Sequence, residues 1–448
     1  MNDIFLINPP QPKPDNLTLK YSPPSPPLGL CYLSPGLKAA GFKVTGWDFE
    51  LKENTISRFL SLLAEKKPLI AGITSLTNTA LTALTVAKLI KNHSPETLIA
   101  LGGQHPAFCY EELLNYDFID YILPGEAEKS FVMLCEAIKN NQNIHNIKGI
   151  AYRKQSKISI SLPDIEPDLD NIPFPDRDLF DITGYFDPVS IVSSRGCNAK
   201  CIFCSATAFR KSKVRFRSSE NILAEIELVY KKGFHVVNFV DDNFLMKKQR
   251  IKEICHGIQK HFPELFWTCS ARADLVDKEI IKLLAQSGCK GIHFGVETAS
   301  EDSQKYIGKY LSLQKLENAL IAADKNNLRT FCSFIIGLPN EDEQQIRKNI
   351  QFAINLHKRH KTSPVFGLLT PFPGTPICNN PEKYDIKIIS KNYSDYDIFT
   401  PVIQTKYLNE NQLRELLFDA QKLYLENMSG DTIQQIQDLS NILEYNNS

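Results

Sequence analysis

Short apolar segments alternate with helical segments along almost the whole chain, and this alternation restricts the fold more than any other feature. In the first 150 residues, the segments expected to be strands are residues 4–7, 43–48, 69–74, 97–101 and 121–123. Between the third and the fourth, apolar residues recur at helical spacing from Leu81 to Ile90. This pattern predicts a doubly wound, Rossmann-like α/β domain with a parallel sheet. Such sheets bind ligands beyond the carboxyl ends of their strands.

The same alternation continues in the second half of the chain. Its expected strands are residues 189–192, 235–240, 266–270, 291–295, 330–336 and 365–369. Six strand–helix units predict a partial (β/α)6 barrel, which is open at one side where a full eight-fold barrel is closed. After the fifth of these strands, Asn340 and Glu343 form an N-x-x-E pattern, which predicts a helix capped by Asn340.

These patterns divide the chain into four parts. Residues 1–150 form the first α/β domain, and residues 189–380 form the partial barrel. Residues 151–188 are expected to be a linker, because five prolines interleaved with acidic residues prevent a continuous helix. Residues 381–448 are a short charged segment, predicted to be helical around residues 410–426.

Three cysteines, Cys197, Cys201 and Cys204, form a CxxxCxxC loop directly after the expected strand at residues 189–192. A [4Fe–4S] cluster normally takes four protein thiolates, so a loop with three leaves one iron open for a small molecule. The alternative is three unrelated buried thiols, since free cysteine is among the most buried residue types. The spacing, with the aromatic Phe203 just before the third cysteine, favours a cluster that has these three cysteines as its metal ligands.

From this loop to the end of the expected barrel, the chain resembles the radical S-adenosylmethionine (SAM) enzymes. The resemblance implies that the amino and carboxylate groups of SAM chelate the open iron. An electron from the cluster, which an external flavodoxin- or ferredoxin-like donor supplies, then splits SAM to give a 5′-deoxyadenosyl radical. The protein's part is orientation, exclusion of water and delivery of the electron, because the hard chemistry belongs to the cofactor.

The resemblance also suggests which residues hold SAM, and most of them follow the ends of expected strands, where functional residues gather in such folds. Asp242 and Asn243 follow the second strand and are expected to face the SAM amino group, although either can instead cap a helix. Ser270 and Arg272 share one side of the third strand. The guanidinium suits the SAM carboxylate, with a surface salt bridge as the alternative. The other residues implied are Glu297 for the ribose, Gly337 and Leu338 for the adenine, and Phe203.

Four loops of the first domain are together similar to the cobalamin-binding domain that precedes many radical SAM cores. They are residues 26–30, 74–77, 102–106 and 124–128. Glycines let the backbone approach a large flat ligand, and small hydroxyls donate without bulk. Each loop alone would equally suit an ordinary nucleotide-binding sheet. The cobalamin contacts that the resemblance implies are Pro27, Leu28, Gly29, Thr74, Ser75, Leu76, Gly102, Gly103, Gln104, His105, Gly125 and Glu126.

The first loop lacks the histidine that many corrinoid proteins use. Those proteins carry a DxHxxG motif after the first strand, whose histidine ligates cobalt from below. Here the position reads Asn8-Pro9-Pro10-Gln11-Pro12, and His105 is the one nearby candidate. We therefore expect cobalamin between the two domains, without a histidine as its lower ligand.

Composition argues against several other classes of protein. Lys+Arg and Asp+Glu number 51 each, so net charge gives no attraction to nucleic acid or to an anionic membrane. No apolar run reaches the roughly 18 residues that a membrane span needs, and the start shows no secretory signal. The eight other cysteines are scattered, which is typical of reduced cytoplasmic proteins rather than of a disulfide framework.

These features favour an enzyme, a cobalamin-dependent radical SAM protein that methylates an unactivated carbon or phosphorus of a small-molecule or natural-product substrate. A radical cyclase, rearrangement or oxidation enzyme would use the same two cofactors and stays open. A protein of another class, a corrinoid-binding or sensory protein with a vestigial radical core, is disfavoured by the intact cysteine loop. Tyr306 and Tyr310 follow the fourth strand at a plausible place for a substrate, but tyrosine more often packs at a rim.

Overall fold

The computed structural model describes residues 3–12, 25–155, 157–185, 189–210 and 213–428. The chain divides into two compact units, residues 1–188 and residues 189–448, and each is described by itself. No helix in the described ranges is long and apolar enough to cross a membrane.

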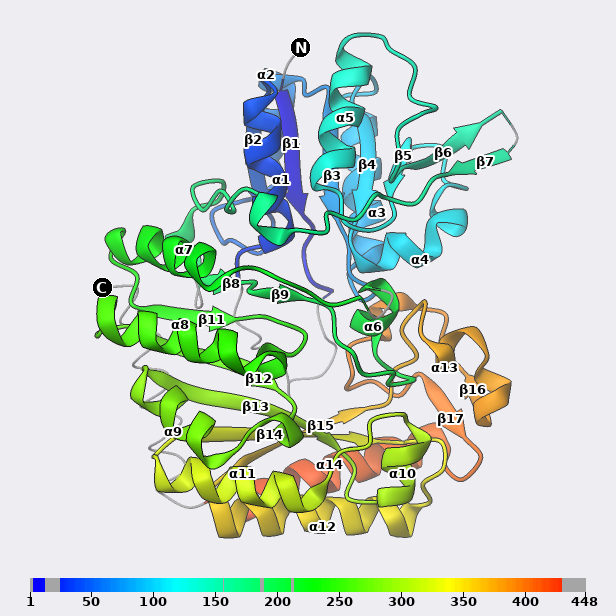
Figure 1. Ribbon diagram of the computed structural model, residues 1–448. Coiled ribbons are helices and arrows are strands. Elements are labelled where there is room, and N and C mark those ends of the chain that lie inside the picture. Colours follow the sequence, from blue (N-terminus) through cyan, green and yellow to red (C-terminus); the bar gives the residue numbers. More distant parts are fainter. Residues whose placement is uncertain (1–2, 13–24, 156, 186–188, 211–212, 429–448) are drawn as a thin grey trace. The chain divides into compact units, whose positions relative to one another are not determined.

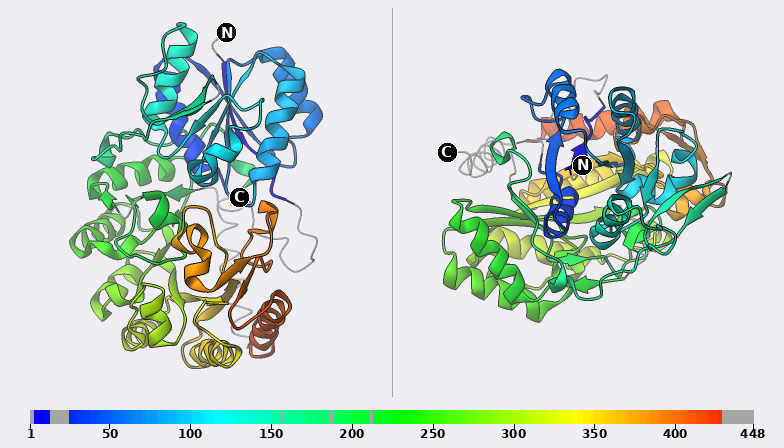
Figure 2. Two further views of the ribbon diagram at one scale, coloured as in Figure 1. Left: turned by 90° about the vertical axis from the view of Figure 1, so that its right-hand side faces the viewer. Right: turned by 90° about the horizontal axis from the view of Figure 1, so that it is seen from above.

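The first unit is built on a seven-stranded sheet with the order β2-β1-β3-β4-β5-β6-β7. Its parallel strands are β1 (Asp3–Asn8), β2 (Lys43–Asp48), β3 (Ile70–Thr74), β4 (Leu98–Gly102) and β5 (Tyr121–Leu123). The helices are α1 (Leu28–Ala39), α2 (Ile56–Lys66), α3 (Ala80–His93), α4 (Gln104–Leu113) and α5 (Glu128–Lys139). Figure 2 shows these helices on both sides of the sheet. Along β1, Ile4 and Leu6 pack into one apolar cluster and Phe5 and Ile7 into the other, so the doubly wound prediction is confirmed.

The segment expected to be a linker begins with two strands that the sequence analysis did not predict. Strands β6 (Ala151–Lys154) and β7 (Lys157–Ile160) extend the sheet in antiparallel fashion beyond β5. Arg153 of β6 donates hydrogen bonds to four backbone carbonyls, those of Leu114, Tyr116, Asp117 and Ile119. The prolines of the segment begin at Pro163, so nothing in residues 151–160 prevents strand pairing.

The rest of this segment is hydrogen-bonded to the first unit. Tyr185 donates its hydroxyl to the buried Asp48 at the end of β2, at 2.7 Å. Asp176 accepts from Ser34 and Lys38 of α1, each at 2.6 Å. The segment is therefore part of the fold of the first unit.

The second unit is built on a six-stranded parallel sheet with the order β15-β14-β13-β12-β11-β8. Its strands are β8 (Ser190–Ile191), β11 (Val236–Phe239), β12 (Phe266–Ala271), β13 (Cys289–Glu297), β14 (Arg329–Ile336) and β15 (Ser363–Leu368). The helices along its outer side are α7 (Ser219–Lys231), α8 (Lys248–His261), α9 (Lys278–Gln286), α11 (Leu313–Lys325) and α12 (Glu343–His360) (Figure 1). β8 and β15 are the two ends of the sheet, which confirms the partial barrel.

Two details of the second unit differ from expectation or add to it. Helix α12 is capped by Asp342, whose side chain accepts from the backbone N of Gln345, so the predicted cap at Asn340 is wrong. The C-terminal segment contains the expected helix, α14 (Glu410–Glu426), and also a small antiparallel pair, β16 (Ile386–Ile388) and β17 (Ile403–Thr405). The last part of that predicted segment, residues 429–448, lies outside the described residues.

Candidate functional site

The three cysteines lie on a loop that is closed by a short antiparallel ladder. Strand β9 (Ser194–Arg195) pairs with β10 (Arg215–Phe216), and the loop with helix α6 (Ser205–Arg210) lies between them. Cys197 and Cys201 are buried, Cys204 is half-buried, and all three thiols are free. Gly196 has φ +93°, and a Cβ built there would lie 1.9 Å from the Lys213 carbonyl oxygen. The start of the loop therefore requires glycine.

Two aspartates at the end of β11 hold this loop from the side. The carboxylate of Asp241 accepts from the Ser193 backbone N at 2.6 Å and from the Ser193 and Ser194 hydroxyls at 2.5 and 2.6 Å. Burial raises the pKa of Asp241, and these hydrogen bonds oppose the rise. Asp242 accepts from the Gly196 backbone N at 2.7 Å. One oxygen of Asp242, a residue expected to face SAM, is thus engaged by the cysteine loop.

A second loop, residues 307–311, follows helix α10 (Glu301–Tyr306) and lies against the cysteine loop. The Ile202 backbone N donates to the Ile307 carbonyl at 3.1 Å, and a Cβ at Gly308 would lie 2.7 Å from the Lys200 carbonyl oxygen. The buried Gln304 side chain holds the loop to the end of β13, since its Nε2 donates to the Val296 and Thr298 carbonyls, each at 2.7 Å. Gln304 lies in α10 and not at a strand end, so the pattern of strand ends in the sequence does not point to it.

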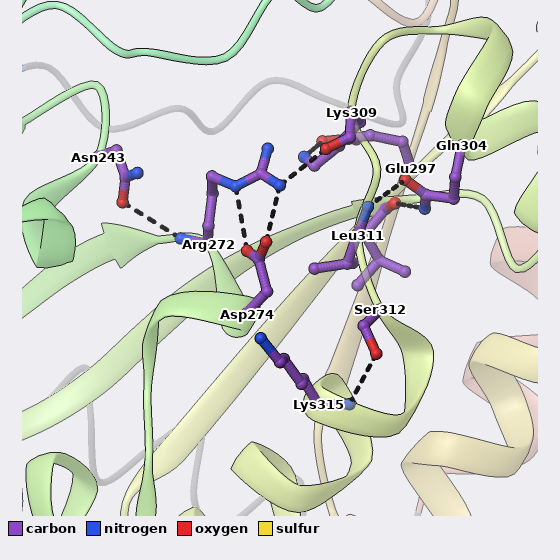
Figure 3. Close-up of polar contacts among 10 residues, drawn as sticks. Asn243, Arg272, Asp274, Glu297, Gln304, Lys309, Leu311, Ser312 and Lys315 are labelled. Atoms are coloured by element: carbon purple, nitrogen blue, oxygen red, sulfur yellow. Dashed lines mark hydrogen bonds and ion pairs between the residues drawn. The ribbon is translucent and has the colours of Figure 1, made fainter.

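Arg272 connects the end of β12 to this second loop (Figure 3). Its Nε and Nη2 donate to the two carboxylate oxygens of Asp274 at 3.0 and 2.9 Å, and Nη2 also donates to the Lys309 carbonyl at 2.7 Å. Its Nη1 has no partner among the residues that the structure describes. Nε and Nη2 therefore form the salt bridge that was the alternative to binding the SAM carboxylate, and Nη1 is left to bind a ligand.

Asn243 lies beside Arg272, as Figure 3 shows. Its Oδ1 accepts from the Arg272 backbone N at 3.3 Å, and the side chain is almost fully buried. Its Nδ2 is a buried donor that no described residue satisfies. Such a group is costly to bury alone, so its position fits a ligand with an acceptor.

The charges around the loop act on its thiols. Lys309 and Glu297, both buried, form a close ion pair at the end of β13 (Figure 3). Burial raises the pKa of Cys201 to about 11. The positive charges of Lys309 and Arg272 oppose this rise, whereas Cys204 and Glu297 add to it. Because a metal binds the thiolate form, the two cations favour binding at this loop.

The donor set fits a cluster better than a single ion. No group of three His, Cys, Asp or Glu side chains in the described part of the chain is arranged to hold one metal ion. An iron–sulfur cube presents a different iron to each thiolate, so its three cysteines need not converge on one point. The free thiols, their partial burial and the nearby cations suit such a cube.

The remaining residues expected at SAM lie in different surroundings. Glu297 ends β13 with φ +69°, an unusual backbone conformation for a residue with a side chain. Ser270 is half-buried on β12, and Phe203 packs against the apolar core. Gly337 has φ +92° and lies against Leu413 of α14, while Leu338 is fully buried. The backbone of Leu338, not its side chain, is therefore what a ligand could contact.

In the first unit, the expected cobalamin loops follow the carboxyl ends of β1, β3, β4 and β5. The chain passes from β1 to β2 on one side and to β3 on the other, so β1 and β3 flank the switch point of the sheet. At this edge Ser75 is buried and Leu76 is exposed. Gly103, with φ +109°, would place a Cβ 2.4 Å from the Ser75 carbonyl oxygen, so the third loop touches the second through backbone alone.

The other residues of the expected cobalamin site differ from one another in burial and in local contacts. Thr74, Gly102, Gln104 and Glu126 are half-buried. Pro27 precedes the first turn of α1, which contains Leu28 and Gly29, and a Cβ at Gly29 would meet no atom within 4 Å. Gly125 has φ +144° and lies against Pro163.

His105 lies in the first turn of α4 and is almost fully buried. Burial lowers its pKa to about 4, so the ring is neutral at pH 7.

Comparisons with known proteins cover both units. Residues 191–353 match the Radical SAM superfamily, and residues 16–134 match the B12 binding domain. An uncharacterized methyltransferase from Pyrococcus horikoshii is 30% identical over 404 residues, which cover 88% of this chain and 86% of that protein. The anaerobic magnesium-protoporphyrin IX monomethyl ester cyclase of Rubrivivax gelatinosus is 24% identical over 423 residues, which cover 90% and 74% of the two chains. Among solved structures, the radical S-adenosylmethionine methyltransferase TsrM from Kitasatospora setae, with cobalamin and [4Fe–4S] cluster bound, is similar with a TM-score of 0.76 at 16% identity, covering 96% of this chain and 89% of TsrM.

Proposed function

Because this chain belongs to the cobalamin-binding radical SAM family, we propose that it is a methyltransferase that acts on an unactivated carbon or phosphorus of a small-molecule biosynthetic intermediate. The observation that carries the proposal is the intact three-thiol loop beside Arg272 and Lys309. A vestigial core would have no reason to keep free, partly buried thiols next to two cations. The relative from Pyrococcus horikoshii, a methyltransferase by name, matches over most of both chains.

The enzyme uses a [4Fe–4S] cluster, SAM and cobalamin. When bound, the cluster and SAM supply a 5′-deoxyadenosyl radical, and cobalamin supplies a carrier for the methyl group. In our proposal Cys197, Cys201 and Cys204 hold the cluster. The unsatisfied Asn243 Nδ2 and the free Arg272 Nη1 support a role for both residues in orienting SAM. Asp242, Ser270, Glu297, Phe203, Gly337 and the Leu338 backbone complete the proposed SAM contacts.

For cobalamin, we propose the loops at the switch point of the first sheet. The close approach of Gly103 to Ser75 and the open space at Gly29 support a backbone surface that a flat ligand can meet. The exposed Leu76 gives this surface an apolar side chain. The proposed contacts remain Pro27, Leu28, Gly29, Thr74, Ser75, Leu76, Gly102, Gly103, Gln104, His105, Gly125 and Glu126.

Methyl transfer is tested by the fate of the SAM methyl group. Protein loaded anaerobically with cluster and cobalamin, reduced, and given SAM labelled at the methyl should release one S-adenosylhomocysteine per bound cobalamin before any substrate is added. With substrate present, the label should appear in the product, and S-adenosylhomocysteine and 5′-deoxyadenosine should both accumulate. Cobalamin-free protein is the control and should release no S-adenosylhomocysteine. Product formed with 5′-deoxyadenosine, but without S-adenosylhomocysteine or label, would establish the cyclase or rearrangement function instead.

The buried position of His105 predicts a second result. The Co(II) form of the cobalamin-loaded enzyme should show no nitrogen superhyperfine splitting from an axial imidazole in its electron paramagnetic resonance (EPR) spectrum, because the ring is enclosed at the start of α4. A triplet splitting that disappears in His105→Gln and persists in His93→Gln, a change at the end of α3, would contradict this prediction.

We also propose a cytoplasmic enzyme that receives its electron from a flavodoxin- or ferredoxin-like protein. All eleven cysteines are free of disulfides, which supports a reducing compartment. The equal numbers of acidic and basic residues support a small-molecule substrate over nucleic acid.

A further inference from the structure

A buried pair of opposite charges lies at the end of β13. The side chains of Lys309 and Glu297 are only 8% and 10% exposed to solvent, and they form a close ion pair. A Cβ at Gly295 would lie 2.5 Å from the Lys309 Nζ and 2.6 Å from the Glu297 Oε1, so the strand leaves room for the pair by having glycine there. Burying two charges is costly even when they are paired, which calls for a reason beyond stability.

The loop that carries Lys309 is fixed against the cysteine loop. Three consecutive residues contribute, since Ile307 accepts from Ile202, Gly308 approaches Lys200, and the Lys309 carbonyl accepts from Arg272. The side chain of Lys309 therefore has little freedom to move relative to the thiols. A charge held in a fixed place in a dry environment acts on its neighbours far more strongly than one in water.

Lys309 directly follows Gly308, where a Cβ would lie 3.9 Å from the Cys201 Cα, so the pair is held close to Cys201. Lys309 lowers the pKa of the Cys201 thiol and Glu297 raises it. Arg272 also lowers the pKa of Cys201, and its guanidinium is held by both oxygens of Asp274. His293 lies on the same strand as Glu297, and burial lowers its pKa, so it is neutral at pH 7. Lys309 and Glu297 are the more deeply buried of the two ion pairs here, and removal of either residue alone would change the local charge by one unit.

We propose that Lys309 and Glu297 are positioning residues that set the reduction potential of the cluster by placing two opposed charges beside the Cys201 thiolate. The proposal rests on the function proposed above, in which Cys201 is a cluster ligand. Reduction of a cluster held by these cysteines, with one electron from a low-potential donor, would lower its charge by one unit. The ammonium stabilises the reduced cluster and the carboxylate destabilises it.

The experiment is an EPR-monitored redox titration of the cluster-loaded full chain without SAM, with titanium(III) citrate as the reductant. Lys309→Met should lower the midpoint potential, because the Glu297 carboxylate is left uncompensated. Glu297→Gln should raise the potential, because the Lys309 ammonium is then unopposed. For a tenfold change in the reduction equilibrium, each shift is about 59 mV for one electron. The double variant, which lacks both charges, should lie close to the wild type.

Controls separate a charge effect from a packing effect. Lys309→Arg keeps the charge and should keep the potential, and Lys231→Met, which breaks an exposed pair with Glu227 on α7, should leave it unchanged. Iron and sulfide are measured in every sample. If Lys309→Met loses its cluster, the inference is tested by Glu297→Gln alone, whose midpoint potential should still rise. Intact clusters whose potentials do not move, or move in the same direction in both single variants, would overturn the inference, whereas a wild type that takes up no cluster would overturn the proposed function.

Discussion

Replacing Cys197, Cys201 and Cys204 together with alanine should abolish the broad iron–sulfur absorbance of the reconstituted protein. The three thiols are free, lie on one short loop, and have Arg272 and Lys309 beside them to favour the thiolate form. Without thiolates the loop offers iron no comparable ligands. Absorbance, iron and acid-labile sulfide after anaerobic reconstitution measure the effect, which we expect to be complete.

The matched control changes cysteines outside the loop. Cys109→Ala and Cys378→Ala together remove two half-buried thiols and should leave the absorbance at the level of the wild type. Far-UV circular dichroism should show that both variants are folded. Full retention of iron and sulfide in the triple variant would refute the cluster assignment.

Gly196→Ala should disrupt the cysteine loop, and Gly233→Ala should not. Both glycines have a positive φ, +93° and +90°, so each substitution carries the cost of about 1–2 kcal/mol that a Cβ has in a left-handed conformation. At Gly233 the new Cβ meets no atom within 4 Å, whereas at Gly196 it lies 1.9 Å from the Lys213 carbonyl oxygen. The β9–β10 ladder must therefore open in Gly196→Ala, and its cluster content should fall sharply.

The two variants are compared by urea unfolding and by iron content. In Gly233→Ala, the free energy of unfolding should fall only by the cost of a Cβ in a left-handed conformation, about 1–2 kcal/mol, and the cluster should be kept. Gly196→Ala should lose more stability and most of its iron. Equal stability and equal iron content in the two variants would show that the loop tolerates a side chain at Gly196.

The strands and the family could be predicted from the sequence because their signals are local. Residues 43–48 and 121–123 were predicted as strands with the bounds that the structure has, since each contains β-branched or aromatic residues and is followed by a turn. Helix α14 was predicted around residues 410–426, which are its bounds in the structure. The cobalamin-binding radical SAM family and its cofactors, predicted from the cysteine loop together with four turns, are confirmed by the comparisons. The individual site residues stay predictions.

Contacts between distant segments could not be predicted in this way. Lys309 lies 12 positions after Glu297, on a loop that is neither a strand end nor a motif, and only the fold brings the two together. Asp241 follows β11 directly, but its three hydrogen bonds depend on where Ser193 and Ser194 lie. At the start of α12, Asn340 and Asp342 both suit a cap, and the sequence does not tell which of them the chain places there.

A fragment of the first unit that ends at residue 150 would have β5 as an uncovered edge strand of its sheet. β5 lies between β4 and β6, so removal of β6 and β7 would expose its backbone donors and acceptors, a template on which other chains can aggregate. The same cut would free Asp48 from Tyr185 and α1 from Asp176. A fragment that ends after Tyr185 retains all of these contacts. Residues 151–160, at the start of the segment that was expected to be a linker, therefore protect the β5 edge from intermolecular strand pairing.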